Sequence, residues 1–397
     1  MIEPRSSLAA GPGAWIRAGT PLLLFVVLGL PAGTIGVAWP PMRASLGAPL
    51  AGLGLLLAAF TAAYFVASGA SGALGTRLGT AVLLASGCGL AAAGMLGLGL
   101  ATAWWMVPAI SLLLGGGCGL IDAAVNAHTS LNRGVRFMGW LHASWAVGAA
   151  LGPLVVVTMV GATGSWRTSF IVIAAAFLSV GLLIGYRRRD WIDGTPHRDQ
   201  LSEETLERGS SPLRALALLI GLFALGAGLE GTAGDWCYTQ LTAGRSLSPG
   251  LAGLGASLFW AGLAGGRMAM GFLGNRIAPD RLLDISVGVS ALGALAFWLA
   301  PPLESALIGL PVLGAAVSVI FPVLLSITPT RVGTDMTSHA VGYELAAGTL
   351  GGGGLPALTG VAVQSAGLLT LGPLLTGFAT GLLVLHLVSR LTPTRVA

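Results

Sequence analysis

The sequence predicts an all-α polytopic membrane protein with twelve transmembrane helices arranged as two six-helix repeats. Of its 397 residues, 54% are hydrophobic and 9% are charged, whereas an ordinary soluble chain has roughly 25% charged residues. The apolar residues gather in stretches of about 20, the length of helix that crosses a bilayer core of roughly 30 Å. Short motifs in the first half of the chain also recur in the second half.

Apolar stretches separated by glycine, proline and arginine are the expected spans. In chain order they lie near residues 18–38, 50–75, 80–100, 105–128, 138–160, 168–186, 214–240, 249–273, 281–300, 304–327, 337–363 and 368–389. The first is longer than a signal-peptide core and leads directly into Trp39-Pro40-Pro41, so we expect it to remain as a span. Glycines inside these stretches let helix backbones approach closely, and we interpret them as packing residues.

One long polar insertion, from Arg187 to Pro212, separates the sixth and seventh stretches. The sequence therefore predicts an N-terminal six-helix bundle at residues 1–186, a cytoplasmic linker at 187–212 and a C-terminal six-helix bundle at 213–397.

The arginines predict the orientation of the chain in the membrane. An inside N-terminus leaves Arg43, Arg167 and Arg245 outside and every other arginine in cytoplasmic segments, in keeping with the excess of basic residues in cytoplasmic loops. We therefore expect a multi-pass protein of the cell's inner membrane, in contact with lipid and with both termini cytoplasmic.

Charge and cysteine usage exclude several classes of function. The net charge of +5 is spread over short loops, so we expect no nucleic-acid partner. Cys88, Cys118 and Cys237 show no metal-ligand spacing, so we expect no disulfide, no metal site and no cofactor. The sequence carries no nucleotide-binding loop and no recognisable catalytic motif. It is therefore not expected to be an enzyme or to use ATP, which leaves ion gradients or simple facilitation.

Two motifs recur about half a chain length apart. Gly72-Ala73-Leu74-Gly75-Thr76-Arg77 closes the second stretch, and Gly271-Phe272-Leu273-Gly274-Asn275-Arg276 closes the eighth. Likewise, Gly148 to Pro153 in the fifth stretch corresponds to Gly351 to Pro356 in the eleventh. Parallel repeats of this kind place a transporter's binding site at the interface between the halves.

The segment Gly72 to Thr80 resembles the signature Gly-x-x-x-Asp-Arg-x-Gly-Arg of the major facilitator superfamily. Gly72, Arg77 and Gly79 match, and Thr76 stands where the signature has its acidic residue. Within that superfamily the chain is most similar to the fucose-proton symporter (sugar porter) group. The patches that carry this similarity are Gly119 to Asn126, Leu141-His142 with Gly148 to Pro153, Glu230-Gly231 with Asp235-Trp236, and Phe259-Trp260 with Gly266-Arg267.

This resemblance implies the major facilitator fold, alternating access and a sugar as cargo. One departure is that the first span, Thr20 to Trp39, contains no carboxylate, whereas the group's fucose carrier has one there. A contact or proton site expected in that span is therefore absent or has moved.

Three acidic residues inside spans are the expected proton-coupling groups, because a carboxylate in hydrocarbon is costly unless it faces a cavity or a partner. They are Asp122, Glu230 and Glu344. Burial favours the neutral form of a carboxyl group, which suits proton exchange. Permanent pairing remains the alternative: Asp122 with Arg133 or Arg136, and Glu344 with Arg331.

Side chains expected to contact the solute combine polar groups with aromatic faces. They are Asn126, one turn beyond Asp122, together with His142, Trp145, Trp236 and Trp260. The alternative for His142 is a satisfied packing residue. The expected gating residues are Gly72, Arg77, Arg267, Gly271 and Arg276. For Arg77 and Arg276 the alternative explanation is membrane topology alone.

The sequence thus predicts a secondary active transporter that moves a small polar solute, with a sugar as the expected cargo, by alternating access and proton symport. We expect a monomer. The Gly148 to Pro153 element looks like the glycine-proline motif of drug antiporters, so proton-driven efflux of drugs or metabolites is an alternative. A non-transporting membrane sensor or scaffold is an alternative of another class.

Overall fold

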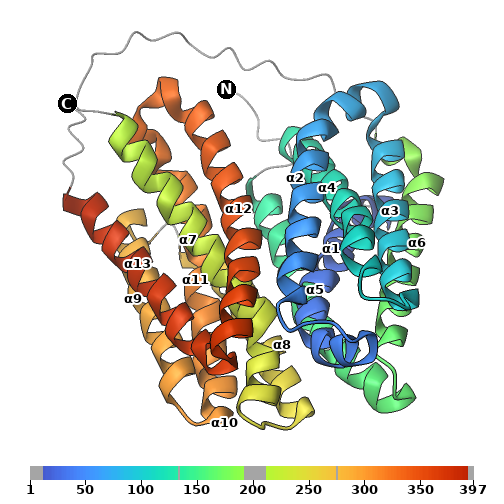
Figure 1. The fold of residues 1–397 in the computed structure, drawn as a ribbon. Helices are drawn as coiled ribbons and strands as arrows, with labels where there is room; N and C mark the ends of the chain where they lie inside the picture. Colours follow the sequence, from blue (N-terminus) through green and yellow to red (C-terminus); the bar gives the residue numbers. More distant parts are fainter. Residues whose placement is uncertain (1–11, 133–134, 192–211, 274–275, 392–397) are drawn as a thin grey trace.

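The computed structural model describes residues 12–132, 135–191, 212–273 and 276–391, and in these ranges the chain is almost entirely helical (Figure 1). The first half contains α1 (Pro12–Leu46), α2 (Gly52–Leu78), α3 (Thr80–Leu100), α4 (Met106–Asn132), α5 (Val135–Thr163), α6 (Arg167–Tyr186) and η1 (Arg188–Trp191). The second half contains α7 (Pro212–Thr239), η2 (Gln240–Gly244), α8 (Pro249–Leu273), α9 (Pro279–Leu299), α10 (Pro302–Glu304), η3 (Ser305–Gly309), α11 (Leu310–Val332), α12 (Thr334–Ala366), η4 (Leu368–Thr370) and α13 (Leu371–Leu391).

These elements form twelve spans, because η2 extends α7, α10 and η3 lead into α11, and η4 leads into α13. Within the described ranges, 11 of the spans are long and apolar enough to cross a membrane. The remaining one is α8, whose 25 residues are long enough but include Arg267 and several glycines. The predicted fold class, an all-α polytopic membrane protein, is confirmed.

Helix α1 extends beyond the stretch expected from the sequence. It runs from Pro12 to Leu46 and includes Pro31, Pro40 and Pro41, whereas the expected stretch covers residues 18–38. Membrane helices tolerate proline when neighbouring helices and local adjustments satisfy the freed carbonyl groups. Trp39 and Met42 are fully buried, so this part of α1 is packed against its neighbours.

The two halves repeat the same pairing of helices. In the first half α1 packs on α5, α2 on α4 and α3 on α6. In the second half the corresponding spans pair in the same way, α7 with α12, α8 with α11 and α9 with α13. The internal repeat predicted from the sequence motifs is therefore present in the packing.

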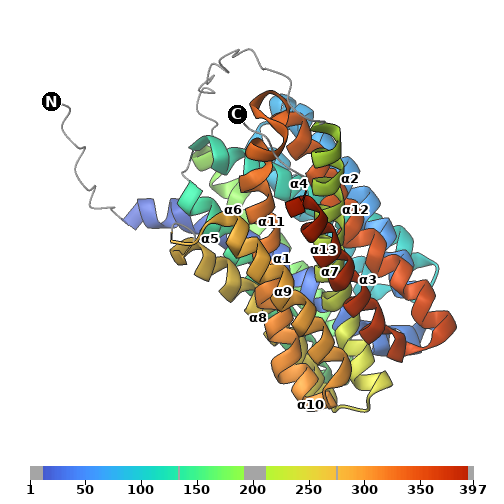
Figure 2. The same ribbon diagram turned by 90° about the vertical axis from the view of Figure 1, so that its left-hand side faces the viewer.

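The halves meet along α2 with α12, α5 with α8, and α1 with α7. Figure 2 shows α12 beside α2. At Gly36 in α1 the backbone oxygen of Asp235 in α7 is so near that a Cβ atom would lie 2.4 Å from it. A second link is a hydrogen bond of 3.0 Å from the Ala51 N–H to Gln364 Oε1 in α12.

Two ends of the bundle can be named from Figure 1. The linker end is where α6 stops and α7 begins, and the α10 end lies opposite. Ala51 and Gln364 lie toward the α10 end, since α2 starts there and α12 finishes there. The contact between Gly36 and Asp235 also lies on that side, near the finish of α1 and α7.

Candidate functional site

An ion pair lies at the junction of the two halves. Arg267 Nη2 in α8 is 3.6 Å from Glu230 Oε1 in α7, and the two side chains are 17% and 18% exposed. The guanidinium also lies 5.7 Å from the centre of the Trp145 ring in α5, which belongs to the other half. Arg267 therefore contacts a carboxylate of its own half and an aromatic face of the opposite half.

Aromatic rings surround this pair. Trp145 and Trp260 meet edge to face with ring centres 5.6 Å apart, a favourable arrangement for aromatic pairs. Trp260 packs against the backbone at Gly234, where a Cβ atom would lie 2.4 Å from the ring. His142, one turn before Trp145, meets Phe25 edge to face at 5.9 Å and lies near enough to Arg267 to be affected by its charge.

We call Glu230, Arg267, His142, Trp145 and Trp260 the central cluster. All five residues were candidates from the sequence, but under three different headings: proton coupling, gating and solute contact. The structure brings them together from α5, α7 and α8. The pairing of Arg267 with Glu230 was not predicted, because a residue's position in an apolar helix does not show which way it faces.

Asp122 lies in a separate place, the contact between α4 and α2. Its Oδ2 accepts a hydrogen bond of 2.6 Å from the Tyr64 hydroxyl, and its Oδ1 accepts one of 3.0 Å from Asn126 Nδ2. Asn126 also donates to the Asp122 carbonyl at 2.9 Å, so its amide group is engaged with Asp122 in this conformation. The side chains of Arg133 and Arg136, the alternative partners, lie outside the described residues.

Tyr64 is a site residue that sequence reasoning missed. Nothing distinguishes a single tyrosine in an apolar stretch until the helix opposite it is known. Gly119 allows the approach, since a Cβ atom there would lie 2.4 Å from the Tyr64 backbone oxygen. Gly119, three residues before Asp122, was the feature of the sequence that indicated a close approach by another helix backbone.

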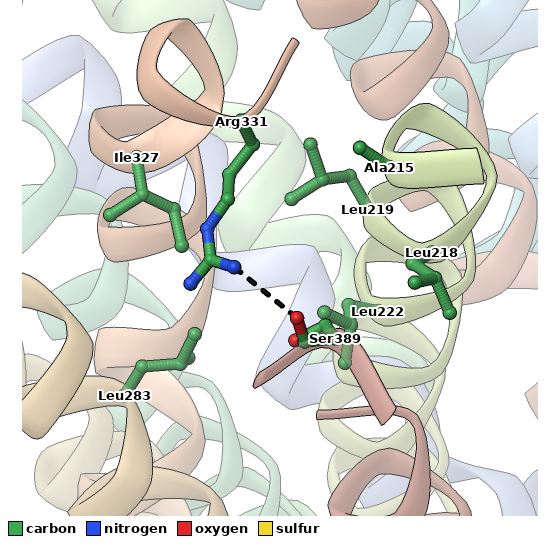
Figure 3. A pocket seen from close by; sticks show the side chains of 8 residues that line it. All are labelled: Ala215, Leu218, Leu219, Leu222, Leu283, Ile327, Arg331 and Ser389. Atoms are coloured by element: carbon green, nitrogen blue, oxygen red, sulfur yellow. Dashed lines mark hydrogen bonds between the residues drawn. The ribbon is translucent and has the colours of Figure 1, made fainter. Parts of the chain in front are cut away.

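Glu344 in α12 is fully buried and lies apart from the central cluster's ion pair. The Thr328 hydroxyl in α11 donates to its Oε1 and Oε2 at 2.9 and 3.0 Å. The alternative that Glu344 pairs with Arg331 is wrong. Arg331 forms an ion pair of 2.7 Å with Asp280 in α9, because its side chain extends toward α9 and α13, away from α12. It also donates to the Ser389 carbonyl at 3.3 Å (Figure 3).

Trp236, expected beside the solute, is a packing residue in this conformation. Its side chain is fully buried, and its Nε1 donates to the Pro356 carbonyl in α12 at 3.0 Å. The neighbouring Asp235 is more accessible, and its carboxylate has no hydrogen bond or ion pair with any described residue. Asp235 lies against α1 of the other half, and in the sequence only the resemblance to the symporter group marks it.

The remaining gating candidates lie toward the linker end. Gly72, Arg77 and Arg276 are exposed, and neither arginine contacts the opposite half through a hydrogen bond or ion pair within the described ranges. Gly271 is in the last turn of α8, and its surroundings lie outside the described residues, as do Gly274 and Asn275 of its motif. Among the gating candidates whose surroundings the structure describes, Arg267 is the one that belongs to the central cluster.

Comparisons with known proteins agree with this architecture. Residues 22–356 match the family described as the Major Facilitator Superfamily. No curated protein matches the chain. Similar solved structures include a bacterial homologue of the human lysosomal transporter Spinster in an inward-facing and occupied conformation. It has 15% identity over 96% of this chain and 97% of that one, with a TM-score of 0.74.

Two further structures are similar at the same level. The nucleoside transporter NupG has 14% identity over 95% of this chain and 99% of that one, with a TM-score of 0.72. The E. coli fucose:proton symporter FucP has 16% identity over 94% of this chain and 98% of that one, with a TM-score of 0.61. At these identities the likeness shows a shared fold. The family match covers most of the chain, so the protein belongs to the major facilitator superfamily and is a transporter rather than an enzyme.

Proposed function

We propose that the protein is a secondary active transporter that moves a small polar solute, with sugars as the expected class, by alternating access coupled to protons. The observation that carries the proposal is the Arg267–Glu230 pair held against Trp145 of the other half. A carboxylate that can accept a proton there would link protonation to the contact between the halves.

The coupling follows from the charges. When Glu230 is ionised, the attraction between it and Arg267 keeps the guanidinium beside α7. When Glu230 takes up a proton, that attraction is lost, and Arg267 is free to bind another group. Because Arg267 also contacts Trp145, its displacement would alter the packing of α8 on α5, one of the contacts between the halves.

Asp122 is proposed as a second proton site. Two donors, Tyr64 and Asn126, hold its carboxylate in one orientation within the N-terminal half. Protonation would change which of these hydrogen bonds can form and so would loosen the contact of α4 with α2.

The solute is proposed to bind at the central cluster. Sugars suit a site of this kind, since the apolar face of the ring packs on an aromatic side chain while polar groups bind the hydroxyls. FucP is described as a fucose:proton symporter and NupG as a nucleoside transporter, which is in keeping with a polar, ring-containing cargo.

The arginine distribution supports an inner-membrane protein whose linker end is cytoplasmic. On this proposal the bundles are residues 1–186 and 213–397, joined by a cytoplasmic segment at 187–212. The protein is proposed to work as a monomer.

The test is pH-electrode recording from weakly buffered, energy-depleted cells that express the protein. Pulses of fucose, glucose, galactose, mannose, N-acetylglucosamine and the corresponding sugar acids are added in turn. We expect external alkalinisation with one compound, and loss of that response in Glu230→Gln and Asp122→Asn. The matched control is Glu304→Gln, which neutralises an exposed carboxylate in α10.

No pH change with any compound, from protein shown to be folded and in the membrane, would overturn proton-coupled uptake. Resistance of the cells to toxic compounds without uptake would then favour efflux.

A further inference from the structure

We propose that the transported solute carries a single carboxylate, as sugar acids do, and that Arg267 binds this carboxylate while Glu230 holds the proton. This inference rests on the proposed function and names the substrate class of the same site.

The first observation concerns the hydrogen-bonding state of Arg267. A guanidinium has five N–H donors in a planar fork. Arg267 donates none of them to any residue that the structure describes, and its contact with Glu230, at 3.6 Å, is longer than a hydrogen bond. The side chain is only 17% exposed. None of its nitrogens is among the fully buried atoms without a partner, so a ligand that supplies acceptors can reach these unused donors.

The second observation is that one neighbouring donor, the Trp260 indole N–H, also lacks an acceptor. Trp260 is 4% exposed, and its Nε1 is a buried donor with no acceptor in the described part of the chain. Indole nitrogen can only donate. Arg267 and Trp260 both contact Trp145, so the two side chains with unused donors are neighbours of one aromatic ring. A carboxylate, with two acceptor oxygens, matches this arrangement better than a hydroxyl group, which has to donate as well.

The third observation is the charge balance around Arg267. Glu230 is the acidic residue that pairs with it, and the residues on the α5 side are His142 and Trp145. Asp235 lies on the same helix, five residues beyond Glu230. Other titratable groups on helices packed against α7 include Arg43 on α1, Arg331 on α11, His339, Tyr343 and Glu344 on α12, and His386 and Arg390 on α13. Of these, Glu344 binds Thr328, whereas Arg331, His386 and Arg390 pair with Asp280 or Asp284 of α9.

This balance favours a monoanion. Once Glu230 is protonated, the Arg267–Glu230 pair has a net charge of one positive unit. A neutral sugar would leave that buried cation uncompensated, which is strongly unfavourable. A single carboxylate compensates it, whereas a phosphate dianion would leave an excess negative charge. No covalent bond forms or breaks: one proton moves to a Glu230 oxygen, and the solute's carboxylate replaces Glu230 beside the guanidinium.

The consequence is a distinctive stoichiometry. One proton and one monoanion cross together, so the transport cycle moves no net charge. A neutral sugar with one proton would move one positive charge, and its uptake would respond to the membrane potential.

The experiment uses the full-length protein in liposomes with a trapped pH dye and a potassium–valinomycin clamp. The probes are galactose, galacturonate and methyl galacturonate, with gluconate, glucuronate and lactate as further acids. Binding is read separately by intrinsic tryptophan fluorescence, because Trp145 and Trp260 adjoin Arg267. We expect at least one acid to enter with protons at a rate that the clamp potential does not change, and its neutral counterpart not to enter.

Variants at the ion pair test the roles of Arg267 and Glu230 separately. We expect Arg267→Gln to weaken binding of the acid by about tenfold or more, the loss of one charge-assisted bidentate contact. Glu230→Gln, which mimics the protonated residue, is expected to bind the acid and to lose the pH dependence of binding. The single variant Arg267→Gln leaves the Glu230 carboxylate unpaired, which could prevent folding. The double variant Arg267→Gln with Glu230→Gln removes both charges and is the control for that effect. Arg281→Gln, an exposed arginine in α9, is the control.

Two outcomes overturn the inference. One is uptake of galactose or another neutral sugar with protons at a rate that follows the clamp potential, which leaves the proposed function standing. The other is binding of none of the acids by a folded protein. If no compound moves with protons at all, the proposed function itself fails.

Discussion

The Tyr64 hydroxyl donates a hydrogen bond of 2.6 Å to Asp122 Oδ2, and this bond joins α2 to α4 within the N-terminal half. We predict that Tyr64→Phe lowers proton-coupled uptake severalfold and moves its pH optimum, because the carboxylate loses one of its two side-chain donors. The loss of one hydrogen bond to a charged group should also reduce stability by about 1.5–3 kcal/mol.

Uptake at a series of pH values and thermal unfolding in detergent would check this prediction. Tyr186→Phe is the control, since that side chain is 90% exposed. An unchanged pH profile in Tyr64→Phe would show that the tyrosine only fills space.

A second prediction concerns the hydrogen bond from Ala51 to Gln364, which crosses between the halves near the α10 end. We predict that Gln364→Ala favours opening at that end. Ala357 lies against Gly54 in the opposite half, so a cysteine introduced by Ala357→Cys should react faster with an impermeant maleimide when Gln364 is replaced. Cys88, Cys118 and Cys237 are buried and should give a low background.

Ser365→Ala, at the neighbouring exposed position, is the comparison for this experiment. Equal labelling rates with and without Gln364 would mean that the hydrogen bond does not hold the halves together.

A third prediction tests the close approach of α1 and α7. Gly36→Val places a side chain where the Asp235 carbonyl lies, so the halves could not close as described. Uptake should fall to near background, while the protein still inserts and purifies. Gly69→Val in α2 is the control, because no atom lies within 4 Å of a Cβ built there. Full uptake by Gly36→Val would argue against this contact as part of the working cycle.

A fourth prediction concerns two arginines assigned to the outside by the sequence. Arg167 donates to the carbonyls of Gly99 and Ala101 at the end of α3. Arg245 donates to those of Trp298 and Ala300 at the end of α9. Both positions place a cation at a helix C-terminus, which is favourable.

Arg167→Ala and Arg245→Ala should therefore each lower the midpoint of thermal unfolding, with a loss of about 1–3 kcal/mol. Arg281→Ala should leave it unchanged. Unaltered unfolding of both variants would show that the arginines do not stabilise these helix ends.

The sequence predicts the fold and names the residues of the candidate site, but it does not predict their contacts. Spans follow from apolar length alone, and motifs such as Gly148 to Pro153 reveal the repeat. The cost of a carboxylate in hydrocarbon also singled out Asp122, Glu230 and Glu344. Partners are harder to predict, because lipid and protein interior are similarly apolar, so the pattern of a membrane helix does not show which face meets another helix. For this reason the sequence did not predict the contacts of Tyr64 and Thr328 or the pairing of Arg267 with Glu230.

The composition of α8 has a consequence for how the protein is made. An arginine within a span makes insertion less favourable, by up to about 2.5–3.5 kcal/mol when it lies at the helix centre. Within the described ranges, α8, which carries Arg267, is the one long helix that is less apolar than a typical membrane span. Helix α7, which carries Glu230, leaves the ribosome before α8, which carries Arg267. Insertion of α7 and α8 as a hairpin would bring the two opposite charges into the bilayer together, so the Arg267–Glu230 pair would help the nascent chain to enter the membrane.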